Sequence, residues 1–309
     1  MNRDKSSSPA GAKISRSAKK AAVAGHRSIA ALMREALPGE SAEDVIRRKC
    51  RAMVALGKSF GWDGPPFDPE ILAGLHGIRV EPSLDEFEGD GRIFPRRGKV
   101  VIQYRAGRMV ERQRFTICHE LAHTCFPDVY EFVRSHSASS EDDPAHREFE
   151  HLCDFGASEL LFPHEPFLQH LGSAAVCMRH ATGLASQFVA STDATLKRIM
   201  DMTAHSCAAV FLTDGAFKEF PVARGQMRVR WMWKSKSFKG FLKQGTLLPR
   251  GICIPGSCSE KADSFPKGRQ TWWINGRPFS WYVEPLALPA IPGSPEYPRV
   301  VALLHSRKP

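Results

Sequence analysis

Two histidines and a glutamate stand close together in the stretch RQRFTICHELAHTCF, residues 112 to 126. His119 and His123 are four residues apart, and Glu120 directly follows the first histidine. On an α-helix, residues four apart are rotated by only about 40° around the axis, so both imidazoles would face the same way and converge on one divalent ion. Glu120 would be rotated by about 100° and lie beside the ion, where its carboxylate can deprotonate a water molecule. The pattern predicts metal-dependent hydrolysis.

The rest of this stretch is consistent with a buried helix. An apolar stripe would pack it against a core, made of Cys118, Leu121, Ala122 and Cys125. A buried helix that merely carries two histidines is the alternative, and a third metal ligand would distinguish the two. The metzincin arrangement is excluded, because it requires Gly and His three and six residues after His123, where this sequence has Phe126 and Val129.

A glutamate on a second helix is the other source of a third ligand. The segment EFEHLCDFGASELLFP, residues 148 to 163, carries Glu150, which follows His123 by 27 residues. Glu150 would complete a three-residue site and leave a fourth position for water. Asp154 lies one turn later on the same face and would accept the outer N–H of a ligand histidine, which orients the ring. Two exposed acids are the alternative, but most of this helix is apolar, and buried carboxylates need a partner.

Several further residues near the motif have an open role. His146, one helical turn before the predicted third ligand, and His151 are alternative metal ligands. Arg114 is either structural or faces the substrate. Tyr130, His136 and Arg114 are candidates for stabilising an oxyanion, and nothing in the sequence separates them.

The two motifs together resemble the ImmA/IrrE family of bacterial metallopeptidases. That family usually reads Arg-Phe-Thr-x-Ala-His-Glu-x-x-His and later Glu-x-x-Ala-Asn-x-Phe-Ala-x-x-Leu-Leu-Met-Pro, and the likeness runs from about residue 45 to 205. The resemblance implies that His119, His123 and Glu150 are the metal ligands and that Glu120 is the general base. It also implies zinc as the cofactor, with manganese as the alternative.

Two positions depart from the family pattern. Asp154 stands where the family usually has Asn, which keeps a hydrogen-bond acceptor at that place. Gly156 stands where the family usually has Phe, and this is expected to remove packing volume near the site. Known family members cleave DNA-binding repressors that are often encoded next door, so the resemblance implies a helix-turn-helix repressor as the substrate.

The chain divides into three parts by composition. Residues 1–25 form a basic tail, rich in Ser, Ala and Lys, that lacks the apolar surface to fold. Residues 26–204 combine helical spacing with short strands, including one over 97–105 after a turn at GDGR, and end in a helix pair over 165–203. From 205 to 309, strand-like runs alternate with Gly/Pro turns. We therefore expect an α+β protein: a mainly helical zincin-like metallopeptidase domain with a small β-sheet, followed by a β-rich or α+β domain for regulation or substrate docking.

Charge, apolar runs and cysteines limit the partners. The net charge is +10, and the first 20 residues carry six of the basic side chains against a single acid. Such a tail would make weak, salt-sensitive contact with nucleic acid, or serve only as a solvated leader or a transit peptide. No apolar run approaches the roughly 18 residues that span a bilayer, so we expect a cytoplasmic protein with no membrane partner. The eight cysteines lack paired spacing, which favours reduced, buried thiols.

Two segments permit a second function. GLASQFVASTDATLKRIM, residues 183–200, has the character of a helix-turn-helix unit, but two helices packed on the catalytic core are favoured. RVRWMWKSKSFKGF, residues 228–241, interleaves aromatic and basic residues as single-strand nucleic-acid sites do. We favour instead a strand in which Val229, Trp231 and Trp233 share one buried face.

The sequence thus predicts a zinc-dependent endopeptidase of the ImmA/IrrE type that cleaves a helix-turn-helix repressor to switch on stress or mobile-element genes. The alternative is a non-enzymatic regulator that binds a partner protein or nucleic acid through the C-terminal domain and the basic tail. Glu120 favours the enzyme, because a purely structural metal site has no use for an acid placed to take a proton.

Overall fold

The computed structural model describes residues 26–85, 87, 89–129, 143–249, 267–274, 276–288 and 299–308. The predicted tail of residues 1–25 and the candidates Tyr130 and His136 lie outside the described residues. The helices are α1 (Arg27–Met33), α2 (Ala42–Ser59), α3 (Pro69–Leu75), α4 (Val110–His123), α6 (Pro144–Leu161), α7 (His164–Leu171), α8 (Met178–Phe188) and α9 (Thr192–Met202). The strands are β1 (Arg79–Ser83), β2 (Gly91–Arg96), β3 (Lys99–Arg105), β4 (Cys207–Thr213), β5 (Arg228–Lys234), β6 (Gly268–Ile274), β7 (Arg277–Leu288) and β8 (Arg299–His305).

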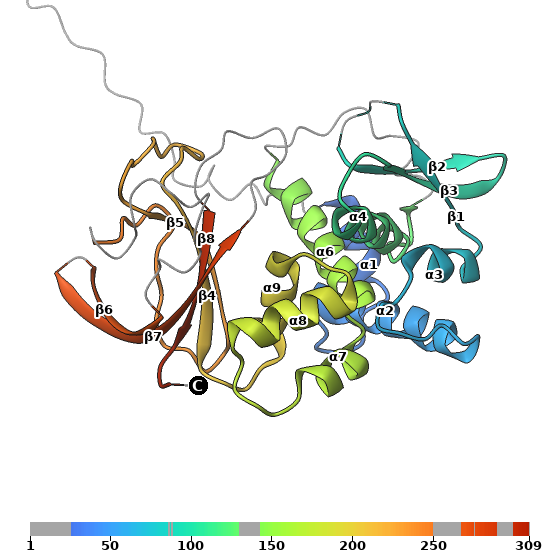
Figure 1. Cartoon of the computed structure of the whole chain (residues 1–309). Helices are drawn as coiled ribbons and strands as arrows, with labels where there is room; N and C mark the ends of the chain where they lie inside the picture. The colour runs from blue at the N-terminus through green and yellow to red at the C-terminus, as the bar shows by residue number, and fades with distance from the viewer. Residues whose placement is uncertain are drawn as a thin grey trace, which may run out of the picture.

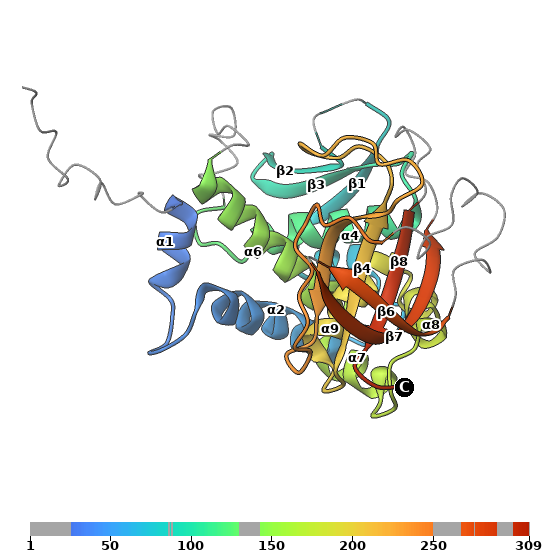
Figure 2. The same ribbon diagram turned by 90° about the vertical axis from the view of Figure 1, so that its left-hand side faces the viewer.

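The elements form two parts that lie side by side (Figure 1). The small sheet β1–β3 lies at one edge next to α3 and α4, with α1, α2 and α6 beside them. The five-stranded sheet β4–β8 stands at the other end, and α8 and α9 lie in between. Figure 2 shows the same order, with the larger sheet in front of the helices. The protein is therefore α+β, with a helical N-terminal part and a β-rich C-terminal part, as the sequence predicted. Within the described ranges, no helix has both the length and the apolar character to cross a lipid bilayer.

The small sheet has the order β1-β3-β2, with β1 parallel and β2 antiparallel to the central strand β3. The tight turn between β2 and β3 is formed by Arg97 and Gly98, whose φ angles of 52° and 77° suit a two-residue hairpin. The turn expected at GDGR does not join neighbouring strands. It instead leads into β2 at Gly91, because β1 pairs with β3 rather than with β2. The sequence analysis had not identified β2.

Local signals fix the starts of several helices. Asp68 and Asp143 cap α3 and α6 through hydrogen bonds to backbone N–H groups, and each is followed by a proline in the first turn. Ser191 caps α9 by accepting from the N–H of Ala194. The helix pair expected over 165–203 is three helices, because α7 ends at Gly172, whose φ of 62° does not continue a helix.

Helices α4 and α6 approach each other very closely at Gly156. A methyl group on this glycine would lie 2.7 Å from the Cβ of Ala122 and 3.2 Å from Cγ2 of Ile46. Two carbon atoms that are not bonded to each other do not approach to 2.7 Å, so a larger residue at this position would push the helices apart. The sequence analysis expected the glycine to remove packing volume near the site. The structure adds that the neighbouring helix occupies the space that a side chain would have filled.

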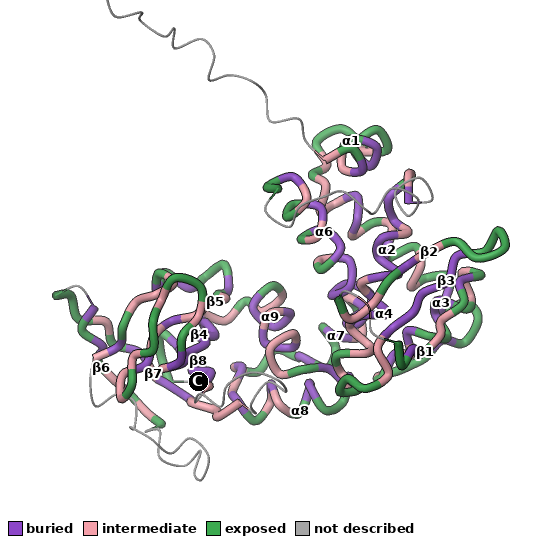
Figure 3. The backbone as a smooth tube through the Cα atoms, turned by 90° about the horizontal axis from the view of Figure 1, so that it is seen from above, coloured by how far each residue is buried: buried purple, intermediate pink, exposed green. Residues whose placement is uncertain are grey.

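The five-stranded sheet has the order β5-β4-β8-β7-β6 and buries both of its faces. Its inner face, with Phe211 and Leu303, belongs to the same hydrophobic core as the helices. Its outer face, with Val210 and Trp272, forms a separate cluster. In Figure 3 the buried residues of β4 and β8 lie toward the middle of the molecule. Glu284 of β7, which is 4% exposed, also joins the two parts, because it accepts a hydrogen bond from the N–H of Met178 at the start of α8.

The predicted strand over residues 228–234 contains a bulge. The register shifts between Phe211 and Leu212 of β4, which pair with Trp231 and Val229 and skip Arg230. Val229 therefore packs on the outer face, whereas Trp231 and Trp233 pack against the core on the inner face. The expectation that all three share one face was wrong, since the extra residue reverses the alternation. Val229 is fully buried, and Trp231 and Trp233 are partly buried against the main core, which favours packing over nucleic-acid binding for this strand.

Helices α8 and α9 pack on the N-terminal part through apolar contacts and one buried ion pair. Leu184, Phe188, Leu196 and Ile199 are all buried in the main core, which supports core packing over a DNA-reading role for residues 183–200. Arg198 of α9 donates to both carboxylate oxygens of Glu159 on α6, at 2.7 and 3.2 Å, and both side chains are 3% exposed.

We expect Arg198→Met to destabilise the protein by about 3–5 kcal/mol, because it leaves the buried Glu159 carboxylate without its main partner. The free energy of unfolding in urea measures this loss. Lys197→Met, at the neighbouring position, which is only partly buried, is the control and should change stability by less than about 0.5 kcal/mol. Equal stabilities for the two variants would contradict a structural role for the pair.

Candidate metal centre

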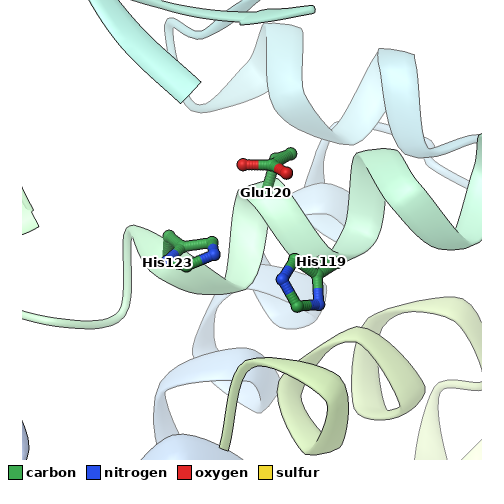
Figure 4. Close-up of side chains that lie close together, drawn as sticks. All are labelled: His119, Glu120 and His123. Atoms are coloured by element: carbon green, nitrogen blue, oxygen red, sulfur yellow. The ribbon is translucent and has the colours of Figure 1, made fainter. Parts of the chain in front are cut away.

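Helix α4 brings three potential ligands together. Ligand atoms of His119, Glu120 and His123 all lie within 4.8 Å of one another. Figure 4 shows the two imidazoles and the carboxylate projecting from one short stretch of the helix. The His119 side chain is 19% exposed, while Glu120 and His123 are 7% and 4% exposed. The cluster is thus buried on one side and reached by solvent at His119.

Helix α6 fixes the orientation of both imidazoles. Nδ1 of His119 lies 2.9 Å from Oδ1 of Asp154, and Nδ1 of His123 lies 3.5 Å from Sγ of Cys153. An outer partner of this kind holds the ring and leaves Nε2 as the nitrogen for a metal ion. Asp154 therefore lies where the sequence analysis expected it.

Glu150 lies next to the first histidine. Its Oε2 is 3.3 Å from Nε2 of His119. Two donors bound to one tetrahedral zinc ion at about 2.0–2.1 Å lie about 3.3 Å apart, so this spacing fits a shared ion. Two imidazoles with one carboxylate are also donors that zinc prefers. The chemistry of His119, His123 and Glu150 thus suits zinc, but the tight cluster in the structure consists of His119, Glu120 and His123, and Glu150 lies outside it, next to His119.

The charges around His119 favour a cation at this place. Burial lowers the pKa of His119, but hydrogen bonds to Asp154 and Glu150 outweigh it and raise the pKa to about 10. Burial raises the pKa of Glu150, but the hydrogen bond to His119 and the nearby histidines bring it down to about 2. The carboxylates of α6 thus stabilise positive charge beside the imidazoles, whether a proton or a metal ion carries it.

Glu120 has the opposite environment. Burial raises the pKa of its carboxyl group to about 7, which the charge of His119 opposes and that of Glu150 reinforces. A carboxylate whose pKa is near neutral can both take up and release a proton at physiological pH. The arrangement therefore combines a cation-binding group with a buried acid–base group.

The other predicted residues lie at different distances from this cluster. Nε2 of His146 is 3.8 Å from Oε1 of Glu150, so it borders the candidate ligand without a hydrogen bond. His151 is 58% exposed and faces α2 instead. Arg114 donates to the backbone oxygen of Phe67, 2.5 Å away, which ties α4 to the loop before α3 and accounts for it structurally.

Two residues at the site escaped the sequence analysis. Cys153 contacts His123, and its position three residues after Glu150 on one helix could have indicated this. Gly91 of β2 packs directly against Glu120. No local pattern signals that contact, because it depends on how the sheet lies on α4.

Part of the chain is similar to a known protein family. Residues 73–200 match the Peptidase M78 family, described as the IrrE N-terminal-like domain. The fold is similar to a solved structure named Mycobacterium tuberculosis transcriptional regulator, with a TM-score of 0.50 and 13% sequence identity over 85% of this chain and 80% of that chain. At this identity the likeness concerns the fold alone. No curated protein sequence matches this chain.

We expect the stability of the zinc-free protein to fall, relative to Glu120→Gln, as the pH rises from about 4.5 to about 7. The pKa of Glu120 is higher in the folded than in the unfolded state, so the folded state binds more protons in this window and loses stability as they leave. The loss should be roughly 3 kcal/mol, measured by urea unfolding across the window. A difference between the two proteins that is independent of pH would contradict a buried carboxyl group.

We expect Asp154→Ala to weaken zinc binding by about 10- to 100-fold, because the His119 ring loses the acceptor that orients it. Competition with a chromophoric chelator measures the affinity. Asp154→Asn keeps a hydrogen-bond acceptor and should lose less zinc affinity than Asp154→Ala. Glu148→Ala removes an exposed acid from the same helix and is the matched control. If both alanine variants bind zinc equally well, Asp154 does not orient the ligand.

Proposed function

Because residues 73–200 form a domain of the IrrE N-terminal-like family, a family of metallopeptidases and regulators, we propose that this protein is a zinc-dependent endopeptidase. The observation that carries the proposal is the buried acid Glu120 beside two imidazoles whose outer nitrogens are both engaged by α6. A site that only held a structural ion would need the imidazoles but not the acid.

Each side chain has a defined role in this proposal. His119, His123 and Glu150 would hold zinc, or manganese in its place, and Asp154 would orient His119. Bound zinc would supply a Lewis acid that polarises the scissile carbonyl and the attacking water. Glu120 would take the proton from that water and pass it to the departing amine, a task suited to its pKa of about 7.

Strand β2 supports an extended peptide as the substrate. It is the edge strand of the small sheet, and its first residue, Gly91, packs on the proposed base. The backbone oxygen of Asp90 accepts from the N–H of Arg105, so even-numbered residues of β2 pair with β3. By the alternation of antiparallel strands, Gly91 and Ile93 then direct their N–H and C=O groups toward the open edge. An extended peptide can pair with such groups as an added strand.

Pro95 limits this edge on the side of the hairpin turn. It has the same orientation as Gly91 and Ile93 but lacks an N–H, so it can only accept a hydrogen bond. A peptide strand would therefore pair best at the end of β2 that lies over α4. This is also the end next to Glu120.

The substrate we propose is a helix-turn-helix repressor encoded nearby, whose cleavage would switch on stress or mobile-element genes. The resemblance of the two motifs to the ImmA/IrrE pattern supports this choice. Residues 205–309 would regulate the enzyme or dock the substrate, and the basic tail would add weak contact with nucleic acid. Cytoplasmic location remains a prediction from the sequence.

Co-expression with the neighbouring helix-turn-helix regulator tests the proposal. We expect the wild-type protein to cleave the regulator into two fragments, seen by immunoblot and by intact mass, and Glu120→Gln to leave it whole. Glu111→Gln makes the same chemical change in the first turn of the same helix and should cleave normally. Removal of zinc by a chelator should stop cleavage, and added zinc should restore it.

If wild type and Glu120→Gln leave the regulator equally intact, this peptidase assignment fails. Binding of the intact regulator by both proteins would then favour the non-enzymatic alternative.

A further inference from the structure

Gly91 is in closer contact with the proposed base than any side chain would allow. A methyl group at this position would lie 2.9 Å from Oε1 and 3.1 Å from Cγ of Glu120, and 2.4 Å from Cγ2 of Thr116. The first two contacts involve a side chain that can swing away, whereas the third involves a β-branched residue in the middle of α4. The backbone of β2 thus lies directly over the carboxylate.

The need for glycine here concerns space and not backbone conformation. Gly91 is absent from the glycines with positive φ among the described residues, so any L-amino acid could adopt its backbone angles. The neighbouring Gly89, in contrast, has a φ of 80°, and a methyl group there would make only an ordinary contact, 3.6 Å from the backbone oxygen of Gly91. Only the contact with Thr116 and Glu120 excludes a side chain at position 91.

An ion-pair network holds Gly91 at this height above α4. The preceding residue, Asp90, accepts hydrogen bonds from Nε of Arg108 at 2.7 Å and from Nε of Arg112 at 2.6 Å. Arg112 belongs to the first half of α4, the helix that carries Glu120. Asp90 also pairs with β3 through Arg105. The start of β2 is therefore attached both to the central strand and to the catalytic helix, and cannot rise freely from Glu120.

We propose that Gly91 is a positioning residue for Glu120: the anchored, side-chain-free backbone at the start of β2 confines the carboxylate to a narrow space beside the imidazoles. This inference rests on the proposed function, since it assigns a role to the base of that reaction. Gly91 acts through Glu120 and makes no contact of its own with a metal ion or a reacting atom. A single methyl group is then enough to displace the base.

Steady-state cleavage by Gly91→Ala tests the proposal. A base displaced by about 1 Å should lower kcat about 100-fold. KM should stay near the wild-type value because alanine keeps the backbone N–H and C=O of residue 91, and the zinc affinity should stay because the three proposed ligands lie on α4 and α6. Gly107→Ala is the matched control, since its added methyl group meets only open space. Wild-type kcat in folded Gly91→Ala would overturn the inference.

The double variant Gly91→Ala/Thr116→Ser separates displacement of the base from displacement of the strand. Serine lacks the methyl carbon that makes the 2.4 Å contact, so β2 can keep its place while the new methyl group still meets Glu120. We expect the double variant to recover thermal stability while kcat remains low, and Thr116→Ser alone to be as active as wild type. Recovery of both stability and kcat would mean that a moved strand, and not a moved base, caused the loss.

A readout without a peptide substrate keeps this inference distinct from the proposed function. Acetohydroxamate chelates zinc and gives a proton to an adjacent carboxylate. The affinity of zinc-loaded Glu120→Gln for acetohydroxamate therefore shows how much binding is lost when the base is removed. The zinc-loaded double variant should show a similar loss. If it binds acetohydroxamate as tightly as wild type, the inference fails, even where the regulator is cleaved. If wild type cleaves no regulator but this loss is seen, the proposed cleavage is wrong while the positioning of Glu120 by Gly91 stands.

Discussion

Helices α4 and α6 touch at Gly156 and Ala122, where a methyl group on the glycine would lie 2.7 Å from the alanine Cβ. All of the candidate metal chemistry depends on this contact, because each helix carries only part of the site. His119 and His123 come from α4, and the groups that complete and orient them come from α6. A bulkier residue between the helices would separate the donors by more than the fraction of an ångström that metal coordination tolerates.

Two carboxyl groups near this contact have pKa values shifted in opposite directions. Glu150 faces the imidazoles from across the helix interface and has its pKa lowered to about 2, which keeps it ionised as a ligand. Glu120 lies on α4 itself, under the edge strand, and burial raises its pKa to about 7. Environments that push two neighbouring acids apart in pKa are how one site obtains a fixed negative charge and a movable proton.

Much of this site could be predicted from the sequence, because its residues follow helical spacing. The four-residue step from His119 to His123 and the step from Glu150 to Asp154 each place two groups on one helix face. The strands over 207–213 and 299–305 were equally evident from their continuous apolar runs. Contacts between elements remote in sequence were not evident.

The failures share a physical cause. Strand β2 was missed because Pro95 and two arginines interrupt its alternation, and its role depends on pairing with β3. The face of Val229 was mistaken because a bulge at Arg230 shifts the register, and no residue type marks that bulge. The close approach of the two helices at Gly156 was not predicted, because a glycine indicates such an approach only once the neighbouring helix is known. Each is a property of tertiary packing rather than of a local pattern.

The larger sheet has no solvent layer between itself and the helices. Phe211 and Leu303 share the main core with residues of α6 and α9, and Glu284 completes the first turn of α8. Replacing this sheet by an unrelated domain would therefore expose the apolar residues of α9 that it covers, unless those residues were changed as well. A substitution at a position in this shared core would therefore affect the packing of both parts.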